Sequence, residues 1–555
     1  MSSPLYLAFL WHMHQPYYKD PVSESYILPW VRLHAIKDYY GMPAILDEFP
    51  NIRQTFNLTP SLIEQLNDYT KGDVSERHLR TTLVPASKLS REDKLFVLRN
   101  FFMANFENMI RPYPGYLEVF HKKGEDVEAA LLKFNAQDFL DLQVWFNLAW
   151  FGYFFKKEDE LLVGLIKKGK GFTEEEKKAL INKQFEVLRK IIPKYKQLQE
   201  KGRIEISVTP YCHPILPLLC DTDIALRSLG ETTLPKYRFR HSEDAKSQID
   251  LAIKCYRDTF GCAPKGLWPS EGSVSEEVAA MAAEAGFLWM ATCQGVLYNS
   301  LKNNPSFSFG PKDLFSPFKI KTGRRHLNMI FRDRGLSDAI SFHYYHQDPQ
   351  EAAKDLMGHL KNICREVKDM EAPLATIIMD GENAWEYYSN DGWDFLRAFY
   401  RRLEEEKDSI KTVTISDYLR KHPPKKTLKR LFPGSWIETN FKIWIGHRED
   451  NTAWDDLYLA RNSLVRFEAK NKDKESQKKT KEAWCHIYIA EGSDWCWWYG
   501  DEHSSDNALE FDALFRNHLM KVYELIGAKI PKKLLVPIAG RSKHSSFSTM
   551  HPGSG

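Results

Sequence analysis

Short apolar runs, each closed by polar or chemically reactive residues, recur along the chain. The first, LYLAFLWH at 5–12, is apolar at nearly every position before its histidine. Continuous rather than alternating hydrophobicity over so few residues is typical of strands buried on both faces, as in parallel sheets. The same pattern predicts strands at 53–60, 204–214, 265–271, 288–293, 327–333 and 375–383.

Stretches with helical periodicity separate these runs. One is SEDAKSQIDLAIKCYRDTFG at 242–261; another, SEEVAAMAAEAG at 275–286, opens on Ser275 with acidic residues in its first turn and closes on Gly286. Strands that alternate with helices predict an α/β fold with a parallel sheet, open or closed into a barrel. Such folds carry their active sites at the carboxyl ends of the strands, where the polar residues of this chain gather.

The pattern changes twice along the chain. Charged, helix-like sequence between about 62 and 200 predicts a helical insert that interrupts a barrel spanning 1–425. After 425 the chain is rich in tryptophan, and the lysine-rich stretch at 468–483 contains enough acidic residues to favour a solvated face over a binding site for an anionic partner. The small polar residues of 541–555 predict a disordered tail.

Charge and cysteine content exclude several classes of protein. The 77 Lys and Arg nearly balance the 74 Asp and Glu, so we expect no nucleic-acid partner. The 8 cysteines form no CxxC pair, which indicates reduced packing residues of a cytoplasmic protein. No run reaches the roughly 18 apolar residues of a membrane span. Because the first residues also lack a basic region, we expect neither a secretory signal nor membrane attachment.

Two histidines and two carboxyl groups stand at predicted strand ends. His12 and His14 are two residues apart, so they share one face of an extended strand directly before a proline ends it. Glu271 lies in LWPSEGS, and Asp380 follows four apolar residues in TIIMDGEN and precedes Gly381. Two carboxyl groups at the mouth of a barrel are the minimal equipment for cleaving a glycosidic bond. The 15 tryptophans suit stacking on the faces of sugar rings or of bases.

Five segments resemble, in the family's order, the sequence regions of glycoside hydrolase family 57, the amylase and amylopullulanase family. They are HQP at 14–16, HPILPLL at 213–219, LWPSEGS at 267–273, MDGEN at 379–383 and SWI…IWIGHREDNTAW at 435–454. The segments FNLTPSLIEQL at 56–66 and WWYGDEHSSDNALEFDALFRNHL at 497–519 resemble the amylopullulanase-like members in particular.

The resemblance implies a fold and an activity. The fold is an incomplete (β/α)7 TIM-like barrel with a helical insert at 62–200 and a helical C-terminal domain at 426–540 that contributes to the active-site cleft. The activity is hydrolysis of α-1,4 bonds in α-glucans and maltooligosaccharides with retention of configuration, without a cofactor or metal and with no partner besides the glucan. Glu271 matches the nucleophile and Asp380 the general acid/base. Six residues match the first glucose subsite: His12, His14, His213, Trp268, Glu382 and His447. Glu382 has a second interpretation, in which it orients Asp380 or a histidine.

Three alternatives stay open at this point. A metal-dependent sugar deacetylase would also use His12, His14, His213 and Asp380, as ligands of an ion with one open position. A glucan-binding protein on an enzyme scaffold would lack one carboxyl group, whereas both are present. Within the family, a 4-α-glucanotransferase shares the glycosyl-enzyme intermediate with a hydrolase and differs in what attacks it. The sequence leaves the cleavage of α-1,6 bonds and the oligomeric state open.

Overall fold

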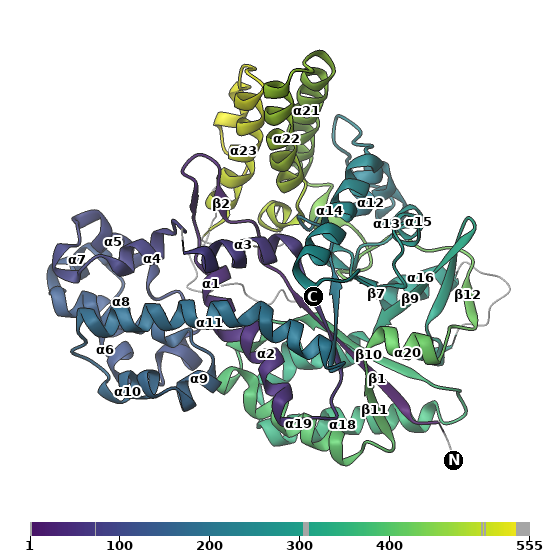
Figure 1. The fold of residues 1–555 in the computed structure, drawn as a ribbon, viewed down its shortest axis with the longest axis horizontal. Helices are drawn as coiled ribbons and strands as arrows, with labels where there is room; N and C mark the ends of the chain where they lie inside the picture. Colours follow the sequence, from purple (N-terminus) through teal and green to yellow (C-terminus); the bar gives the residue numbers. More distant parts are fainter. Residues whose placement is uncertain (1–2, 73, 303–309, 501–502, 504–506, 540–555) are drawn as a thin grey trace.

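The computed structural model describes residues 3–539 except 73, 303–309, 501–502 and 504–506, so the predicted tail at 541–555 lies outside the described residues. Its core is a sheet of parallel strands that are almost fully buried, as their apolar sequences predict (Figure 1). In chain order these strands are β1 (Leu5–Met13), β4 (Gln54–Leu58), β5 (Ile204–Val208), β6 (Gly266–Leu267), β7 (Trp289–Cys293), β9 (Arg325–Arg332) and β10 (Leu374–Asp380).

The sheet curls until its two ends meet. Neighbouring strands pair in parallel in the order β10-β1-β4-β5-β6-β7-β9. At the seam between β9 and β10, the N–H of Asp333 donates to the carbonyl of Thr376 at 3.1 Å. The predicted incomplete (β/α)7 barrel is therefore confirmed. Short strands extend the sheet: β11 (Ile410–Val413) pairs with β1, β8 (Phe318–Thr322) runs antiparallel to β9, and β12 (Lys426–Leu428) pairs with β8.

Two predicted strands are longer in sequence than in the structure. The runs 204–214 and 265–271 contain the strands β5 and β6, which end at Val208 and Leu267. Pro210 and Pro269 follow shortly after these ends, and a proline has no N–H to continue a ladder. The residues beyond the strands form turns that carry His213 and Glu271 instead.

Helices connect the strands on the outside of the barrel. The side chain of Ser275 caps α15 (Glu276–Glu284) by accepting from the N–H of Val278, and Gly261 ends α14 (Ser242–Phe260) at φ +75°. Both helices stop within two residues of the predicted ends. The other connecting helices are α3 (Pro60–Lys71), α12 (Leu216–Cys220), α13 (Ala225–Leu229), α16 (Gln294–Lys302), α17 (Arg334–Asp338), α18 (Pro349–Glu366), α19 (Trp393–Glu405) and α20 (Ile415–Lys421).

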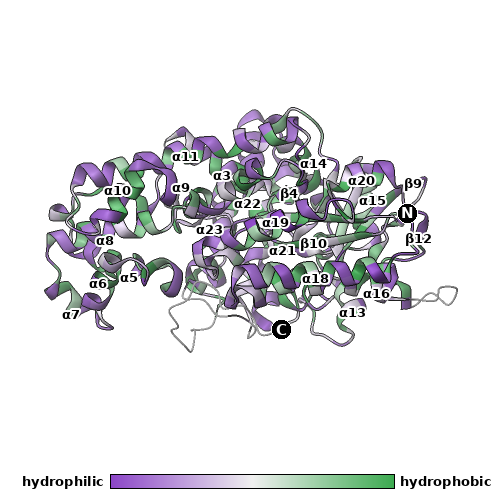
Figure 2. Ribbon diagram, turned by 90° about the horizontal axis from the view of Figure 1, so that it is seen from below, coloured by the Kyte–Doolittle hydropathy of each residue, from purple (hydrophilic) through white to green (hydrophobic). Residues whose placement is uncertain are grey.

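A lobe of helices stands beside the barrel, on the left of Figure 1. Its helices are α4 (Arg77–Leu83), α5 (Arg91–Asn100), α6 (Pro114–Lys123), α7 (Val127–Lys133), α8 (Ala136–Ala149), α9 (Tyr153–Glu158), α10 (Glu160–Lys168) and α11 (Glu174–Glu200). The long helix α11 reaches from this lobe back to β5. In Figure 2 the apolar faces of these helices turn inward and the polar faces outward. The division of the chain into domains at 62, 200 and 426 stays a prediction.

A buried ion pair fastens the lobe to the N-terminal part of the barrel. Arg32, on α1 (Trp30–His34), donates to both carboxylate oxygens of Glu76 at 2.8 and 2.9 Å. The same guanidinium donates to Asn147 on α8 and to Gln184 on α11. Because each of the three guanidinium nitrogens has an acceptor, the charges are tolerated in the interior, and breaking the pair by removing one partner would cost about 3–5 kcal/mol.

His78, on α4 of the lobe, gives a prediction of acid sensitivity. The imidazole is buried among Phe96, Phe101 and Phe146, and neither nitrogen has a partner among the described residues. Burial lowers its pKa from 6.5 to about 4. Below pH 6.5 the unfolded chain therefore binds a proton that the folded chain does not, and the stabilisation is lost as the pH falls toward 4. Replacement by phenylalanine removes this loss, which amounts to about 2 kcal/mol between pH 7 and pH 5.

Urea unfolding of the wild type and His78→Phe at both pH values measures this difference. A change in packing that alters the free energy of unfolding of the variant equally at both pH values does not affect the result. Only the difference in the free energy of unfolding between pH 7 and pH 5 is compared. An equal loss of stability in both proteins on acidification would show that His78 is not the group concerned.

Three long helices form the C-terminal part of the chain, at the top of Figure 1. They are α21 (Arg448–Lys470), α22 (Lys474–Ala490) and α23 (Ala508–Leu525). Arg461 on α21 pairs with Asp244 on α14, and Asn517 on α23 donates to Asp20 on β2 (Lys19–Asp20) at 2.8 Å. These contacts dock the helices on the barrel, next to the ends of β1 and β5. Within the described part of the chain, no helix combines the length and apolar character needed to cross a membrane.

Candidate active site

The carboxyl ends of β1 and β10 lie side by side and carry the first site residues. His12 pairs in register with Asp380 on one side and with Asn57 on the other. The N–H of Gly381 donates to the carbonyl of His12 at 2.8 Å. A Cβ atom at Gly381 would meet the Sδ of Met13 at 2.3 Å, so the side chain of Met13 packs into the space that glycine leaves directly after Asp380.

Glu271 is held in a strained turn after β6. It lies in the 3₁₀ turn Ser270–Gly272 with φ +57°, a left-handed conformation that is costly for a residue other than glycine and that is often found at functional sites. Both of its carboxylate oxygens accept a hydrogen bond from tryptophan: Oε2 from Nε1 of Trp436 at 2.8 Å, and Oε1 from Nε1 of Trp497 at 3.1 Å. Its backbone carbonyl accepts from the N–H of Trp436 at 2.9 Å. These contacts fix the carboxyl group in one orientation.

The two carboxyl groups influence each other. Burial and the charge of Asp380 raise the pKa of Glu271 from 4.5 to about 7, against the hydrogen bonds from the two indoles. Burial raises the pKa of Asp380 from 3.8 to about 6, although His14, Arg332 and Asn383 favour its charged form. The pair therefore holds about one proton near pH 6.5. One acid beside one carboxylate is the charge state that a retaining glycosidase needs.

Three imidazoles stack on one another near this pair, and His14 influences both of its carboxyl groups. The rings of His14 and His213 have centroids 3.8 Å apart with 16° between their planes, and His12 contacts His213 through their Nε2 atoms at 3.1 Å. Burial lowers the pKa of His12 to about 3 and that of His213 well below its usual value. Both nitrogens of His12 and of His213 contact side chains of the protein, whereas Nδ1 of His14 has no partner among the described residues. A hydrogen bond to a sugar hydroxyl is therefore open to His14 rather than to the other two rings.

Groups from distant parts of the chain orient these rings. His12 Nδ1 contacts the Oδ1 of Asn57 at 2.6 Å, and His213 Nδ1 contacts the Oγ of Ser493 at 2.9 Å. His14 Nε2 contacts the Oδ1 of Asp494 at 2.7 Å. Ser493 and Asp494 follow α22, so the C-terminal helices complete the histidine cluster.

The remaining predicted site residues lie in different surroundings. Glu382 accepts from the N–H of His14 at 3.0 Å and from the hydroxyl of Tyr39 at 3.1 Å, and burial raises its pKa. These contacts favour the interpretation in which it orients a histidine. Trp268 is fully buried against His12 and Trp436, which suits a wall of the site better than an exposed stacking platform.

His447 stands at the start of α21. It follows Trp444, whose ring packs edge-on against Trp497 with centroids 6.1 Å apart. The segment thus runs close to the indole that binds Glu271. A direct role of His447 in binding substrate stays a prediction.

The group best placed for a metal consists of His14, His213 and Asp494, whose ligand atoms lie within 4.8 Å of one another in the described part of the chain. The lone pairs of imidazole nitrogens lie in the ring plane. Because the rings of His14 and His213 are stacked nearly parallel, their lone pairs do not converge on one ion at the roughly 2.0 Å that Zn²⁺ requires. The geometry favours hydrogen bonding over metal binding, and thus a sugar site over the deacetylase alternative.

The prediction from sequence missed several side chains that contact the site. They are Asn57, Arg332, Trp436, Ser493, Asp494 and Trp497. A signal existed for three of them, since Trp436 and Trp497 lie in the two tryptophan-rich segments and Arg332 in a predicted strand with a polar end.

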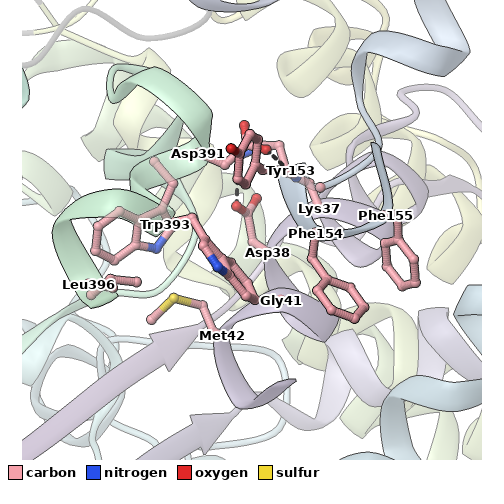
Figure 3. A pocket seen from close by; sticks show the side chains of 12 residues that line it. Lys37, Asp38, Gly41, Met42, Tyr153, Phe154, Phe155, Asp391, Trp393 and Leu396 are labelled. Atoms are coloured by element: carbon pink, nitrogen blue, oxygen red, sulfur yellow. Dashed lines mark hydrogen bonds and ion pairs between the residues drawn. The ribbon is translucent and has the colours of Figure 1, made fainter. Parts of the chain in front are cut away.

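A small cavity lies elsewhere, between the lobe and the barrel (Figure 3). Its lining includes Lys37, Tyr153, Asp391 and Trp393, and the carboxylate of Asp391 accepts from the N–H of Tyr153 at 2.7 Å. Its volume of about 20 Å³ suffices for roughly one water molecule and not for a sugar. The cavity is therefore not the substrate site.

The fold is a parallel α/β barrel, and two carboxyl groups lie among imidazoles and indoles at the carboxyl ends of its strands. The sequence profile of Glycosyl hydrolase family 57 matches residues 8–430, and the chain belongs to this family. The resemblance derived from the sequence is thereby confirmed, and the protein is an enzyme. No curated protein sequence matches the chain.

Solved structures of the same family share the fold. A branching enzyme of Thermococcus kodakaraensis, solved with glucose, superposes with a TM-score of 0.62 at 16% identity, over 96% of this chain and 93% of that chain. An α-amylase of Thermotoga maritima gives 0.59 at 14% identity over 96% of each chain. A branching enzyme of Pyrococcus horikoshii gives 0.58 at 16% identity over 99% of each chain. At such low identity these similarities concern the fold alone.

Proposed function

We propose that this protein is a retaining α-glucan hydrolase of the α-amylase type. The observation that carries the proposal is the pair of Glu271 and Asp380, in which two indoles donate to Glu271 and each carboxyl group is close enough to His14 to be influenced by it. The substrate class is supported by the sequence regions of the family and by similarity in fold to an α-amylase and to branching enzymes.

In the first step, Asp380 donates its proton to the glycosidic oxygen while an oxygen of Glu271 attacks the anomeric carbon. The bond to the leaving sugar breaks, and a glycosyl-enzyme ester forms. In the second step, Asp380 takes a proton from water, the resulting nucleophile attacks the same carbon, and Glu271 is released as a carboxylate. Each step inverts the carbon, so the product has the configuration of the substrate.

The roles require the single proton of the pair to reside on Asp380. In the free site it favours Glu271, which has the higher pKa. A bound glycosidic oxygen accepts from protonated Asp380 and stabilises that form, while the indoles of Trp436 and Trp497 stabilise the carboxylate of Glu271. Substrate binding therefore shifts the proton toward the productive arrangement.

The experiment that tests the proposal is incubation of EDTA-treated enzyme with maltoheptaose. New reducing ends and shorter oligosaccharides, abolished in Glu271→Gln, are the expected result, with the α-anomer appearing first in the proton NMR spectrum. Longer and shorter products without new reducing ends would instead establish a 4-α-glucanotransferase. Activity on an acetylated sugar only after metal is restored would overturn the proposal. Pullulan in parallel tests for cleavage of α-1,6 bonds, the amylopullulanase-type activity.

The compartment proposed is the cytoplasm. All of the cysteines, including the buried Cys212, Cys220, Cys293 and Cys496, are free thiols in the structure. Such thiols are typical of a reducing environment.

A further inference from the structure

Arg332 is a buried cation beside the carboxyl pair that the proposed mechanism leaves unused. It is the last residue of β9, at the same end of the barrel as Asp380, and only 6% of it is exposed. Its Nε donates to the carbonyl of Ile378 on β10 at 2.6 Å, and its guanidinium pairs with Asp338 at 2.5 Å. These bonds fix the orientation of the guanidinium across the seam of the barrel.

The guanidinium also lies over the ring of Trp436, 5.5 Å from its centroid. This is cation–π geometry. The edge of the same indole packs against Trp268, with centroids 5.2 Å apart. Trp436 is therefore held by a charged plane and an aromatic ring while its Nε1 donates to Glu271 at 2.8 Å. Arg332 thus contacts Trp436, the indole that donates to Glu271. Its positive charge also acts on Asp380.

We propose that Arg332 is a positioning residue that holds the indole of Trp436 against the carboxyl group of Glu271 and places a fixed positive charge beside Asp380. The inference rests on the proposed function, because it assigns the two carboxyl groups their catalytic roles. Arg332 itself does not touch the reacting atoms.

Several other groups face the same carboxyls. Asp380 is influenced by His14, which follows β1, and by Asn383 from the turn after β10. Asp380 in turn raises the pKa of Glu271 and of Glu382. Glu271 is influenced by Asp380, by His14 and by the indoles of Trp436 and Trp497.

The positive charge of Arg332 favours the charged form of Asp380, and burial opposes it. Arg332 is itself flanked by Asp333 and paired with Asp338. Loss of its charge therefore raises the pKa of Asp380, and loss of support for Trp436 raises the pKa of Glu271.

Three variants separate charge from shape. Arg332→Met removes the charge and the hydrogen bonds. Arg332→Lys keeps the charge but lacks the planar guanidinium group. The matched control is Arg334→Met, because Arg334 pairs with the same Asp338 but is exposed and does not contact Trp436 or the carboxyl pair. For each enzyme, kcat and KM on maltoheptaose are measured across pH, and folding is checked by thermal unfolding.

In Arg332→Met we expect kcat to fall about 100-fold with a smaller change in KM, since a displaced indole misplaces the nucleophile. We also expect the pH profile of kcat/KM to move upward by roughly one unit. Arg332→Lys should keep a profile closer to that of the wild type while kcat stays reduced, and Arg334→Met should match the wild type in both.

A wild-type profile in both Arg332 variants would overturn the inference while leaving the proposed function intact. Should Arg332→Met fail to fold, Arg332→Lys decides alone, and an unchanged kcat in that variant would overturn the inference. A wild type without activity on maltoheptaose would instead disprove the proposed function, so the two failures are distinguishable.

Discussion

Glu271→Gln and Asp380→Asn each lower the turnover of maltoheptaose by about a thousandfold or more, because each removes a group that makes or breaks a covalent bond. Folding is retained in both, since the amides have nearly the same shape as the carboxyls they replace. At Glu271 an amide still offers an oxygen to one indole, and the half-buried side chain of Asp380 accepts, within the described part of the chain, a single hydrogen bond, from Asn383 at 3.4 Å. Initial rates and thermal unfolding of both variants check this expectation.

A substrate with a good leaving group assigns the two roles. With a dinitrophenyl maltooligoside the first step needs no proton, so Asp380→Ala should form the glycosyl-enzyme quickly and then release it slowly. Added azide should then give a glycosyl azide of retained configuration. Glu271→Ala with azide should give the inverted product, because azide attacks the substrate directly. The opposite pair of outcomes would exchange the roles, and near-normal activity in either amide variant would contradict the assignment of the site.

Trp497→Phe is expected to have the second largest effect. The phenyl ring fills most of the space but cannot donate to the Oε1 of Glu271, a bond of 3.1 Å. A hydrogen bond to a charged group contributes about 1.5–3 kcal/mol, so kcat/KM should fall roughly 10- to 150-fold. The pKa of Glu271 should also rise further above about 7, because the donor that favours the carboxylate is gone. The pH profile of kcat/KM therefore moves upward.

Trp498→Phe is the control for this variant. Its Nε1 has no partner among the described residues, and its ring stacks on Phe511 with centroids 5.2 Å apart. The phenyl group keeps the stacking and loses no hydrogen bond, so activity should stay near that of the wild type. Similar losses in both variants would mean that the segment is merely sensitive to substitution and that the bond from Trp497 has no special role.

Much of the barrel could be predicted from sequence because its signals are local. A strand buried on both faces is a short continuous apolar run in the sequence. In a parallel barrel all of the strands end at the same face, so the residue after each run lies at the mouth of the barrel. His12 and Asp380 were found in this way. Strand lengths were less certain, since Pro210 and Pro269 end β5 and β6 earlier than the apolar runs suggest.

The sequence by itself determined the family and the run of parallel strands, and it singled out Glu271 and Asp380 as candidates for catalysis, because each of these inferences depends on residues that are neighbours in the chain. Only the tertiary structure decided what surrounds them. The indoles of Trp436 and Trp497 reach Glu271 across 165 and 226 residues of chain, and Asp494 reaches His14 across 480. No local sequence pattern predicts such contacts, because they form only when elements far apart in the sequence pack against one another. Docking sets the burial and the charges, and these in turn place the pKa values of both carboxyl groups near neutrality.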